Sequence, residues 1–187
     1  MKQQTYRLRV FYEKRGVSVV ISQKDFAKII ERTLRRVDFP FKFSEGFHPR
    51  PRLSFGPPLP VNIAGLNEAF EVYAVRSIDE QELLDRVNSI LPRGTHFHRA
   101  GWVMPSLPSL VESAVTATYI LKGNPPPAPE EIAVLGEVTS AGENHLQILV
   151  NLKNFTHAPL KKMLGFLTVE RIIHWSNHEK IRGTDFN

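Results

Sequence analysis

Hydrophobic and polar positions alternate over residues 5–13 (TYRLRVFYE), which predicts a β-strand with one buried face. After a turn at a glycine, apolar residues recur at helical spacing and form one stripe, so we predict a helix over residues 23–37. Ser22 and Asp25 provide an S-x-x-D start of the capping-box kind, and Pro40 prevents the helix from continuing.

Three more strands and one more helix are predicted in the first half of the chain. They are strands at 39–43, 68–75 and 95–103 and a helix at 79–91. The resulting order, β-α-β-β-α-β, is that of the split βαβ or ferredoxin-like arrangement, an antiparallel sheet with two helices on one face. A long proline-rich segment at 44–60 replaces the tight turn between the second and third strands, and we expect a turn at Gly65.

Beyond a seam at 104–110 the pattern is shorter and less regular. Strands are predicted at 115–121, 145–152 and 169–176, a short helix at 158–167, and a turn or extended linker at 123–129. Residues 130–138 are ambiguous between a short helix and a strand. We interpret 105–187 as a reduced second α+β, ferredoxin-like unit. Because its isolated core would be marginal, we expect it to pack on the first unit, residues 1–104.

Composition narrows the class of protein. The 187 residues are 42% hydrophobic and 23% charged, which is ordinary for a globular protein. The absence of cysteine excludes disulfides, thiolate metal sites and iron–sulfur clusters held by this chain. No apolar run approaches the roughly 20 residues of a membrane span, so we expect no signal peptide, no membrane contact and a cytoplasmic protein. A net charge of +5 fits either spare surface lysines or a partner that carries phosphates.

Residues 44–60 (SEGFHPRPRLSFGPPLP) are too irregular for a helix and too rigid for a flexible linker. Pro49 and Pro51 have a fixed φ and keep His48 and Arg50 out of the helical region, so this part of the segment is predicted to be extended and stiff. A stiff segment loses little entropy on binding, which suits its cationic groups to the recognition of phosphates.

Eight residues in and near this segment are candidate nucleic-acid contacts. They are Arg32, Arg36, Lys42, Ser44, His48, Arg50, Arg52 and Ser54. Phe47 and Phe55 either stack on bases or anchor the segment to the core. Arg32 and Arg36, one helical turn apart, either belong to a solvated face, pair with Asp25 or bind a phosphate.

The stretch ISQKDFAKIIERTLRRVDFPFKFSEGFHPRPRLSFGPPLPVNI resembles the radical-SAM-linked family of uncharacterised bacterial proteins, a domain of unknown function found next to or fused to radical SAM proteins. The matching residues are Ser22, Asp25, Arg32, Leu34, Arg35, Arg36, Ser44, Gly46, Phe47, Pro49, Pro51, Leu53, Ser54, Phe55, Pro58, Leu59 and Pro60. The chain departs from the family pattern at Gln23, Lys24, His48 and Arg50. The resemblance covers 5–104 well and implies a bacterial cytoplasmic protein that works beside a radical SAM enzyme on tRNA or rRNA.

Other arrangements of reactive residues are sparse. His96 and His98 share one face of a predicted strand but have no third ligand nearby in sequence, so we expect no metal and no cofactor. Phosphate-loop, dinucleotide-binding and nucleophile-elbow motifs are absent from the sequence. Asp25, Glu45 and His48 would form an acid–base group if the fold brought them together.

Three hypotheses follow. The first is a non-catalytic RNA-binding accessory module for tRNA or rRNA that acts with a radical SAM enzyme and uses the eight candidate residues. The second is an RNA-processing or RNA-modifying enzyme with acid–base groups near the basic segment. The third is a protein–protein adaptor for a radical SAM partner, in which the basic charge is incidental.

Overall fold

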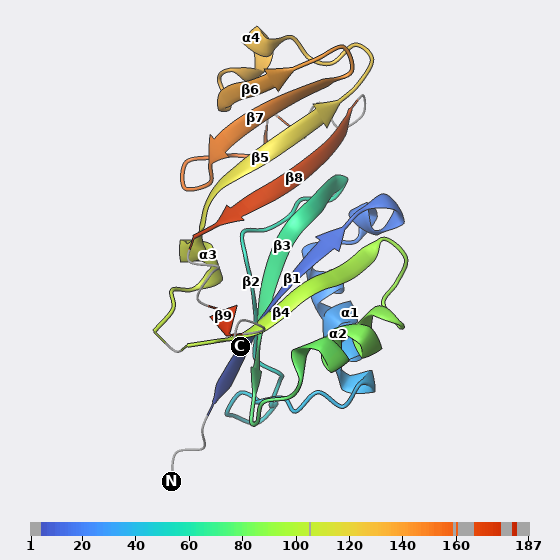
Figure 1. Ribbon diagram of the computed structural model, residues 1–187, viewed down its shortest axis with the longest axis vertical. Helices are drawn as coiled ribbons and strands as arrows, with labels where there is room; N and C mark the ends of the chain where they lie inside the picture. Colours follow the sequence, from blue (N-terminus) through green and yellow to red (C-terminus); the bar gives the residue numbers. More distant parts are fainter. Residues whose placement is uncertain (1–4, 105, 159, 161–166, 177–180, 183–187) are drawn as a thin grey trace, which may run out of the picture.

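One sheet runs through the whole length of the molecule (Figure 1). The computed structural model describes residues 5–104, 106–158, 160, 167–176 and 181–182. The strands are β1 (Tyr6–Lys14), β2 (Leu53–Phe55), β3 (Ile63–Ala74), β4 (Thr95–Val103), β5 (Ala114–Lys122), β6 (Glu137–Ala141), β7 (His145–Asn151), β8 (Thr168–Trp175) and β9 (Ile181–Arg182). The helices are the 3-10 helix η1 (Gly16–Val20) and the α-helices α1 (Gln23–Arg36), α2 (Glu80–Asn88), α3 (Leu110–Ser113) and α4 (Pro129–Ile132).

The strands lie in the order β6-β7-β5-β8-β3-β1-β4-β9, and β2 pairs with β3 off this path. All of these pairs are antiparallel except β3 with β8, which is parallel. The order β2-β3-β1-β4 in the first part is repeated as β6-β7-β5-β8 in the second. The chain is therefore a mixed α+β protein with a mostly antiparallel sheet.

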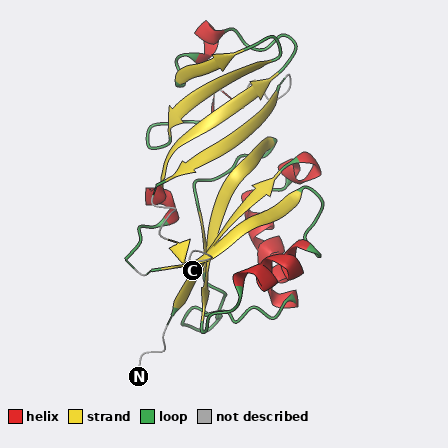
Figure 2. Ribbon diagram, viewed as in Figure 1, coloured by secondary structure: helices red, strands yellow, loops and turns green. Residues whose placement is uncertain are grey.

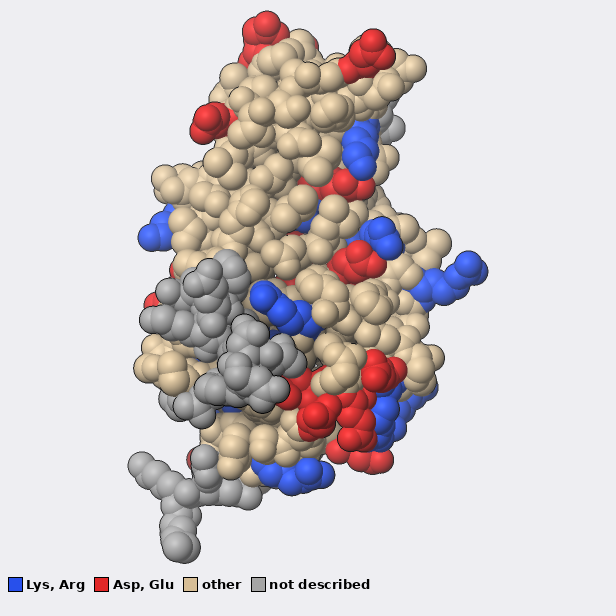
Figure 3. All heavy atoms as spheres, in the orientation of Figure 1, with Lys and Arg blue, Asp and Glu red and all other residues tan. Residues whose placement is uncertain are grey.

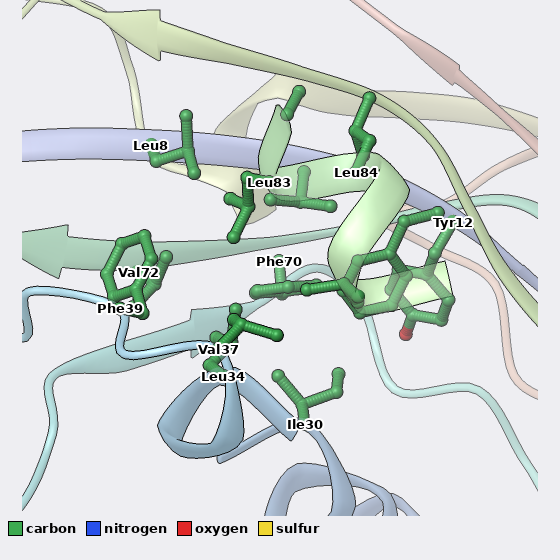
Figure 4. Packing of buried hydrophobic residues seen from close by; sticks show 14 of the residues in the cluster. Leu8, Tyr12, Ile30, Leu34, Val37, Phe39, Phe70, Val72, Leu83 and Leu84 are labelled. Atoms are coloured by element: carbon green, nitrogen blue, oxygen red, sulfur yellow. The ribbon is translucent and has the colours of Figure 1, made fainter. Parts of the chain in front are cut away.

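In the first part, α1 and α2 cover one face of the strands, whereas the second part is almost all strand (Figures 1 and 2). Alternation along β1 directs Leu8 and Tyr12 towards the helices. There they pack with Ile30 and Leu34 of α1 and with Leu84 of α2 (Figure 4). The opposite, helix-free face of these strands carries charged side chains such as Arg9 and Glu71 together with a few apolar ones.

A second core lies in the second part and extends under α3. The inward residues of β5, β7 and β8 pack with Ile132 of α4. The same cluster includes Phe11 of β1 and Ala69 of β3, which lie on the helix-free face of the first part, together with Leu110 of α3 and Trp175 of β8. The two parts of the chain therefore share apolar contacts as well as strand pairing, although the predicted boundary between 104 and 105 itself stays a prediction.

β3 is long enough to serve both parts of the sheet. Its first residues, Ile63 to Gly65, pair with β8, and its later residues pair with β2 along the same edge. Where β3 and β8 diverge, Asn67 bridges them: its side-chain amide donates to the carbonyl of Ile173 at 2.8 Å, and the Trp175 indole donates to the Asn67 carbonyl at 2.9 Å.

Most of the predicted elements agree with the structure within three residues. They are the helices at 23–37 and 79–91 and the strands at 5–13, 95–103, 115–121, 145–152 and 169–176. The ambiguous residues 130–138 contain both the end of α4 and the start of β6. The helix predicted at 158–167 lies largely outside the described residues.

Three predictions about the first part are wrong. Residues 39–43 form only isolated bridges, from Phe41 to Ala74 and from Phe43 to Pro51, rather than a strand. The true β2 lies inside the proline-rich segment, so most of that segment precedes β2 instead of following it. Gly65 is not a turn but a buried residue within β3, where an added Cβ would overlap Glu68 and Leu59.

None of the helices in the described part of the chain combines the length and the apolar character that crossing a membrane requires.

Candidate functional site

The proline-rich segment forms a closed loop at residues 44–50, which we call the tip loop. The Ser44 backbone N–H donates to the Arg50 carbonyl at 2.8 Å, and the Arg50 N–H donates to the Ser44 hydroxyl at 3.0 Å. Gly46, at φ 118°, supplies a conformation that other residues rarely adopt. Because both ends of the tip loop are tied together, its backbone is held before any ligand binds.

The base of the tip loop is joined to the end of β3. The Arg52 N–H donates to the Lys42 carbonyl, and the Lys42 N–H donates to the Tyr73 carbonyl at 2.7 Å. The Tyr73 N–H in turn donates to the Arg52 carbonyl at 3.1 Å. This ladder places the tip loop beyond the end of the sheet, at the lower end of the molecule in Figure 1.

The tip loop exposes an aromatic and a cationic side chain. Phe47 has a relative exposure of 102%, and His48 and Arg50 are also exposed. The anchor interpretation is therefore wrong for Phe47. It is right for Phe55, which packs on Phe70 of the core with ring centroids 5.8 Å apart. Arg50 forms no ion pair with any carboxylate of the described residues, so its guanidinium is open to an external anion.

Arg52 lies on the helix-free face of the sheet and stacks on Tyr73. Leu53 and Phe55 pack against the core below the helices, so alternation turns Arg52 and Ser54 to the other face. The Arg52 Cζ lies 4.4 Å from the centroid of the Tyr73 ring. Arg52 is exposed and, like Arg50, has no carboxylate partner within the part of the chain that the structure describes.

Ser54 is directed to a protein group rather than to solvent. Its hydroxyl lies 3.5 Å from the Glu71 carboxylate, and the side chain is half-buried. Lys42 is also half-buried, and its neighbour Phe41 is buried in the core. Of the eight candidate residues, Ser54 is the one whose predicted contact with an external phosphate the geometry argues against.

Arg32 and Arg36 are exposed on α1, in the helical layer, whereas Arg52 is on the opposite face of the sheet. Of the three alternatives for these two arginines, pairing with Asp25 is not found among the described residues: Asp25 accepts instead from Lys28 at 2.9 Å and from the Ser22 hydroxyl at 2.8 Å. These hydrogen bonds hold the pKa of Asp25 below its ordinary value.

The eight candidates therefore do not form one patch. Ser44, His48 and Arg50 lie at the tip loop, Lys42 and Arg52 at its base, Ser54 beside Glu71, and Arg32 and Arg36 on the helix side. Between these groups, Arg35 is bound to Glu31 through two hydrogen bonds of 3.0 and 2.9 Å and lies over the rings of Phe41 and Phe43.

The helix-free face also holds a buried charge cluster that the sequence analysis did not single out. Arg9 donates to Glu71 through Nε at 3.0 Å and Nη2 at 2.8 Å, and Arg7 Nε lies 3.7 Å from the same carboxylate oxygen. Both arginines also donate to backbone carbonyls, Arg7 to those of Met104 and Leu107 and Arg9 to that of Pro108. They fasten the segment that leads to α3 onto the sheet. Alternation over residues 5–13 was the available signal, since it places both arginines on one face.

Arg99 extends this cationic face along β4. Its Cζ lies 4.0 Å from the centroid of the buried Phe11 ring. Burial and the nearby charge of Arg9 lower the pKa of Arg99. The space-filling view shows acidic and basic side chains together over the first part, whereas the centre of the second part is largely uncharged in this view (Figure 3).

The predicted acid–base group does not form. Arg35 lies near the tip loop, with its Cζ 5.5 Å from the Phe43 ring. Asp25 is ten residues earlier on the same helix, which corresponds to about 15 Å along its axis. Asp25 is therefore at the far end of α1 from Glu45 and His48. The arrangement offers anion binding and aromatic stacking rather than a set of converging proton-transfer groups.

His96 and His98 of β4 are the two histidines that the sequence analysis compared with a pair of metal ligands. His98 lies at an irregularity in the pairing with β1, and its ring is 6.5 Å from that of Phe11. Burial, followed by the charge of Arg99, lowers the pKa of His98. Within the described ranges, no three histidine, aspartate or glutamate side chains are grouped closely enough to hold a metal ion.

Comparison with known proteins identifies a family but no activity. Residues 7–162 match a family whose description is "uncharacterized protein conserved in bacteria" (DUF2344). No curated protein matches the chain.

Proposed function

Because the chain belongs to the DUF2344 family of uncharacterized bacterial proteins, whose description assigns no activity, we propose its function from its surface: it binds RNA through the tip loop and Arg52. In this proposal it is a non-catalytic module that holds RNA in the bacterial cytoplasm for a partner enzyme. The contacts are Arg50, Arg52 and His48 for phosphates and Phe47 for a base.

The proposal rests on the exposure and the charge pairing of Arg50 and Arg52. Arg50 and Arg52 are exposed and lack a carboxylate partner among the described residues, in a segment that backbone hydrogen bonds hold in place. Phosphates are the common anions that planar, two-pronged guanidinium groups fit. A fully exposed phenylalanine, Phe47, lies in the same segment and adds a surface on which a base can stack.

The test is the salt dependence of RNA affinity, measured by fluorescence anisotropy with a labelled tRNA. Each phosphate contact contributes a slope of about −0.7 to −0.9 in a plot of log affinity against log salt. Arg50→Ala/Arg52→Ala is expected to make that slope shallower by about 1–2 and to weaken binding at low salt.

Arg93→Ala is the matched control. Tyr73 pairs with Arg7 at one end of β1, whereas Thr95, two residues after Arg93, pairs with Lys14 at the other end. Seven residues of strand separate these ends by about 23 Å. The control removes a positive charge far from the tip loop and should leave the slope unchanged. Equal effects of the control and the double variant would refute the assignment of the site.

Two finer assignments belong with this proposal. The order β2-β3-β1-β4 and its repeat β6-β7-β5-β8 support two ferredoxin-like units in tandem. The resemblance of residues 22–60 to the radical-SAM-linked family supports partnership with a radical SAM enzyme, which would receive the bound RNA. Affinity purification of the tagged chain from a bacterial lysate, with and without nuclease, tests the partnership. Loss of the radical SAM protein from both samples would refute it.

A further inference from the structure

Arg52 is an exposed side chain whose guanidinium lies over an aromatic ring. Its Cζ is 4.4 Å from the Tyr73 ring centroid, a distance that brings the planar group into contact with the ring. The tyrosine is itself held by two backbone hydrogen bonds at the base of the tip loop. A planar cation that is already stacked on one side is a platform for a second planar group, and guanidinium planes are among the surfaces on which unpaired bases stack.

A comparison of Arg35 with Arg52 shows which of the two guanidinium groups is open to a ligand. Both arginines lie over aromatic rings near the tip loop, Arg35 over Phe41 and Phe43. The N–H groups of Arg35, however, donate to Glu31, which neutralises its charge. Arg52 has no such carboxylate within the described residues, so its in-plane donors stay available to a phosphate or to the edge of a base.

Phe47 supplies a second platform in the same segment. Its ring is fully exposed, so both of its faces are accessible. Phe47 and Arg52 are five positions apart in the chain, which places their Cα atoms at most about 18 Å apart. His48 and Arg50 lie between them along the chain. A short strand of nucleic acid can therefore contact stacking groups at both ends and cations between them.

Bases are available for such stacking only when they are unpaired. In a double helix each base is stacked on its neighbours and paired to its partner, and proteins read RNA duplexes through phosphates and hydroxyls instead. We infer, on the premise of the RNA-binding function proposed above, that the ligand of the tip loop is an unpaired RNA segment, with one base stacked on Arg52 and another on Phe47.

The test compares the full chain's binding of oligoadenylate alone with its binding of the same strand annealed to oligouridylate. We expect the single strand to bind at least tenfold more tightly. Phe47→Leu and Arg52→Lys, which preserve the charge, should each weaken single-strand binding about tenfold and leave duplex binding unchanged. Arg93→Lys is the matched control and should change neither. Thermal unfolding of each variant verifies that the fold is intact.

The outcomes separate this inference from the function on which it rests. A preference for the single strand that Phe47→Leu and Arg52→Lys abolish supports the inference. Equal affinity for both forms, with Arg50→Ala weakening both, overturns the inference while RNA binding stands. If neither the single strand nor the duplex binds at low salt, both the inference and the proposed function are overturned.

Discussion

The guanidinium of Arg171 on β8 and the carboxylate of Glu68 on β3 form a buried, two-pronged ion pair. Arg171 Nε donates to Glu68 at 2.9 Å and Nη2 donates to its other oxygen at 2.6 Å. The remaining donors reach the carbonyls of Pro57 and Pro58 at 3.0 and 2.9 Å. One side chain thus joins both parts of the sheet to the end of the proline-rich segment. Burial favours the neutral arginine, but Glu68 more than offsets this and raises the pKa of Arg171.

Arg171→Met is expected to destabilise the protein by about 3–5 kcal/mol, because it leaves the Glu68 carboxylate buried without a partner. Chemical denaturation followed by circular dichroism measures the loss. The double variant Arg171→Met/Glu68→Met should recover a large part of it, since an apolar pair leaves no buried charge. A decrease of less than about 1 kcal/mol in the unfolding free energy of the single variant would show that this ion pair does not hold the two parts of the sheet together.

Ionisation of the buried Tyr119 phenol is expected to destabilise the protein at alkaline pH. Burial raises the pKa of this residue to about 12 from the ordinary value of 10.0. A phenol whose pKa is raised by folding stabilises the fold fully below pH 10, and that contribution is lost as the pH rises towards 12. Tyr119→Phe should flatten the fall in unfolding free energy across this window, while losing about 1 kcal/mol near neutral pH with the hydrogen bond to His157.

Denaturant unfolding at a series of pH values, together with tyrosinate absorbance, checks this expectation. The flattening will be partial, because burial also raises the pKa of Tyr12 well above its ordinary value. Identical alkaline profiles of wild type and Tyr119→Phe would contradict the assignment.

Ser22→Ala should cost about 1 kcal/mol of stability. The Ser22 hydroxyl accepts from the Asp25 N–H at 3.1 Å and caps the first turn of α1. Because the pKa of Asp25 is lowered in the fold, its contribution is present above the ordinary value of 3.8 and disappears as acid protonates it. The difference between Ser22→Ala and wild type should therefore shrink at low pH in unfolding experiments. Ser77→Ala, at an exposed loop position, is the control and should change stability by less than about 0.5 kcal/mol.

Ser44→Ala should loosen the tip loop without unfolding the protein. The variant keeps the backbone hydrogen bond from Ser44 to Arg50 but removes the hydroxyl that accepts from the Arg50 N–H. Amide hydrogen exchange at Arg50, measured by NMR, should become faster, and RNA affinity should fall because a looser loop loses more entropy on binding. Global stability should change by no more than about 1 kcal/mol. Unaltered exchange at Arg50 would mean that the hydroxyl does not hold the loop.

The stiffness of the proline-rich segment was predictable from its residues. Pro49 and Pro51 restrict the backbone of their own and the preceding residues, and this restriction does not depend on the rest of the fold. The assignment of its cationic groups to phosphate recognition rested on this stiffness, and two of those groups, Arg50 and Arg52, are exposed. Charge pairing on α1 was predictable for the same local reason at Glu31 and Arg35, which are one turn apart.

Contacts between distant residues were not predictable in this way. The sequence around Arg52 does not predict that it contacts Tyr73, and the sequence around Ser54 does not predict that it contacts Glu71. Both contacts arise because β2 pairs with β3 in one particular register. The assignment of residues 39–43 as a strand failed for the same reason, since a strand requires a partner along its length and this stretch meets one only at single bridges.

Local elements of this protein can be read from its residues because helix periodicity, capping and proline geometry act over a few neighbouring positions. The pairing of β3 with β8, the buried Arg171–Glu68 pair and the separation of Arg32 and Arg36 from Arg52 cannot be read in this way. The first two depend on segments that meet across more than a hundred residues of chain, and the third depends on which face of the sheet each segment takes. These choices are made by burial of the whole apolar surface rather than by any local preference.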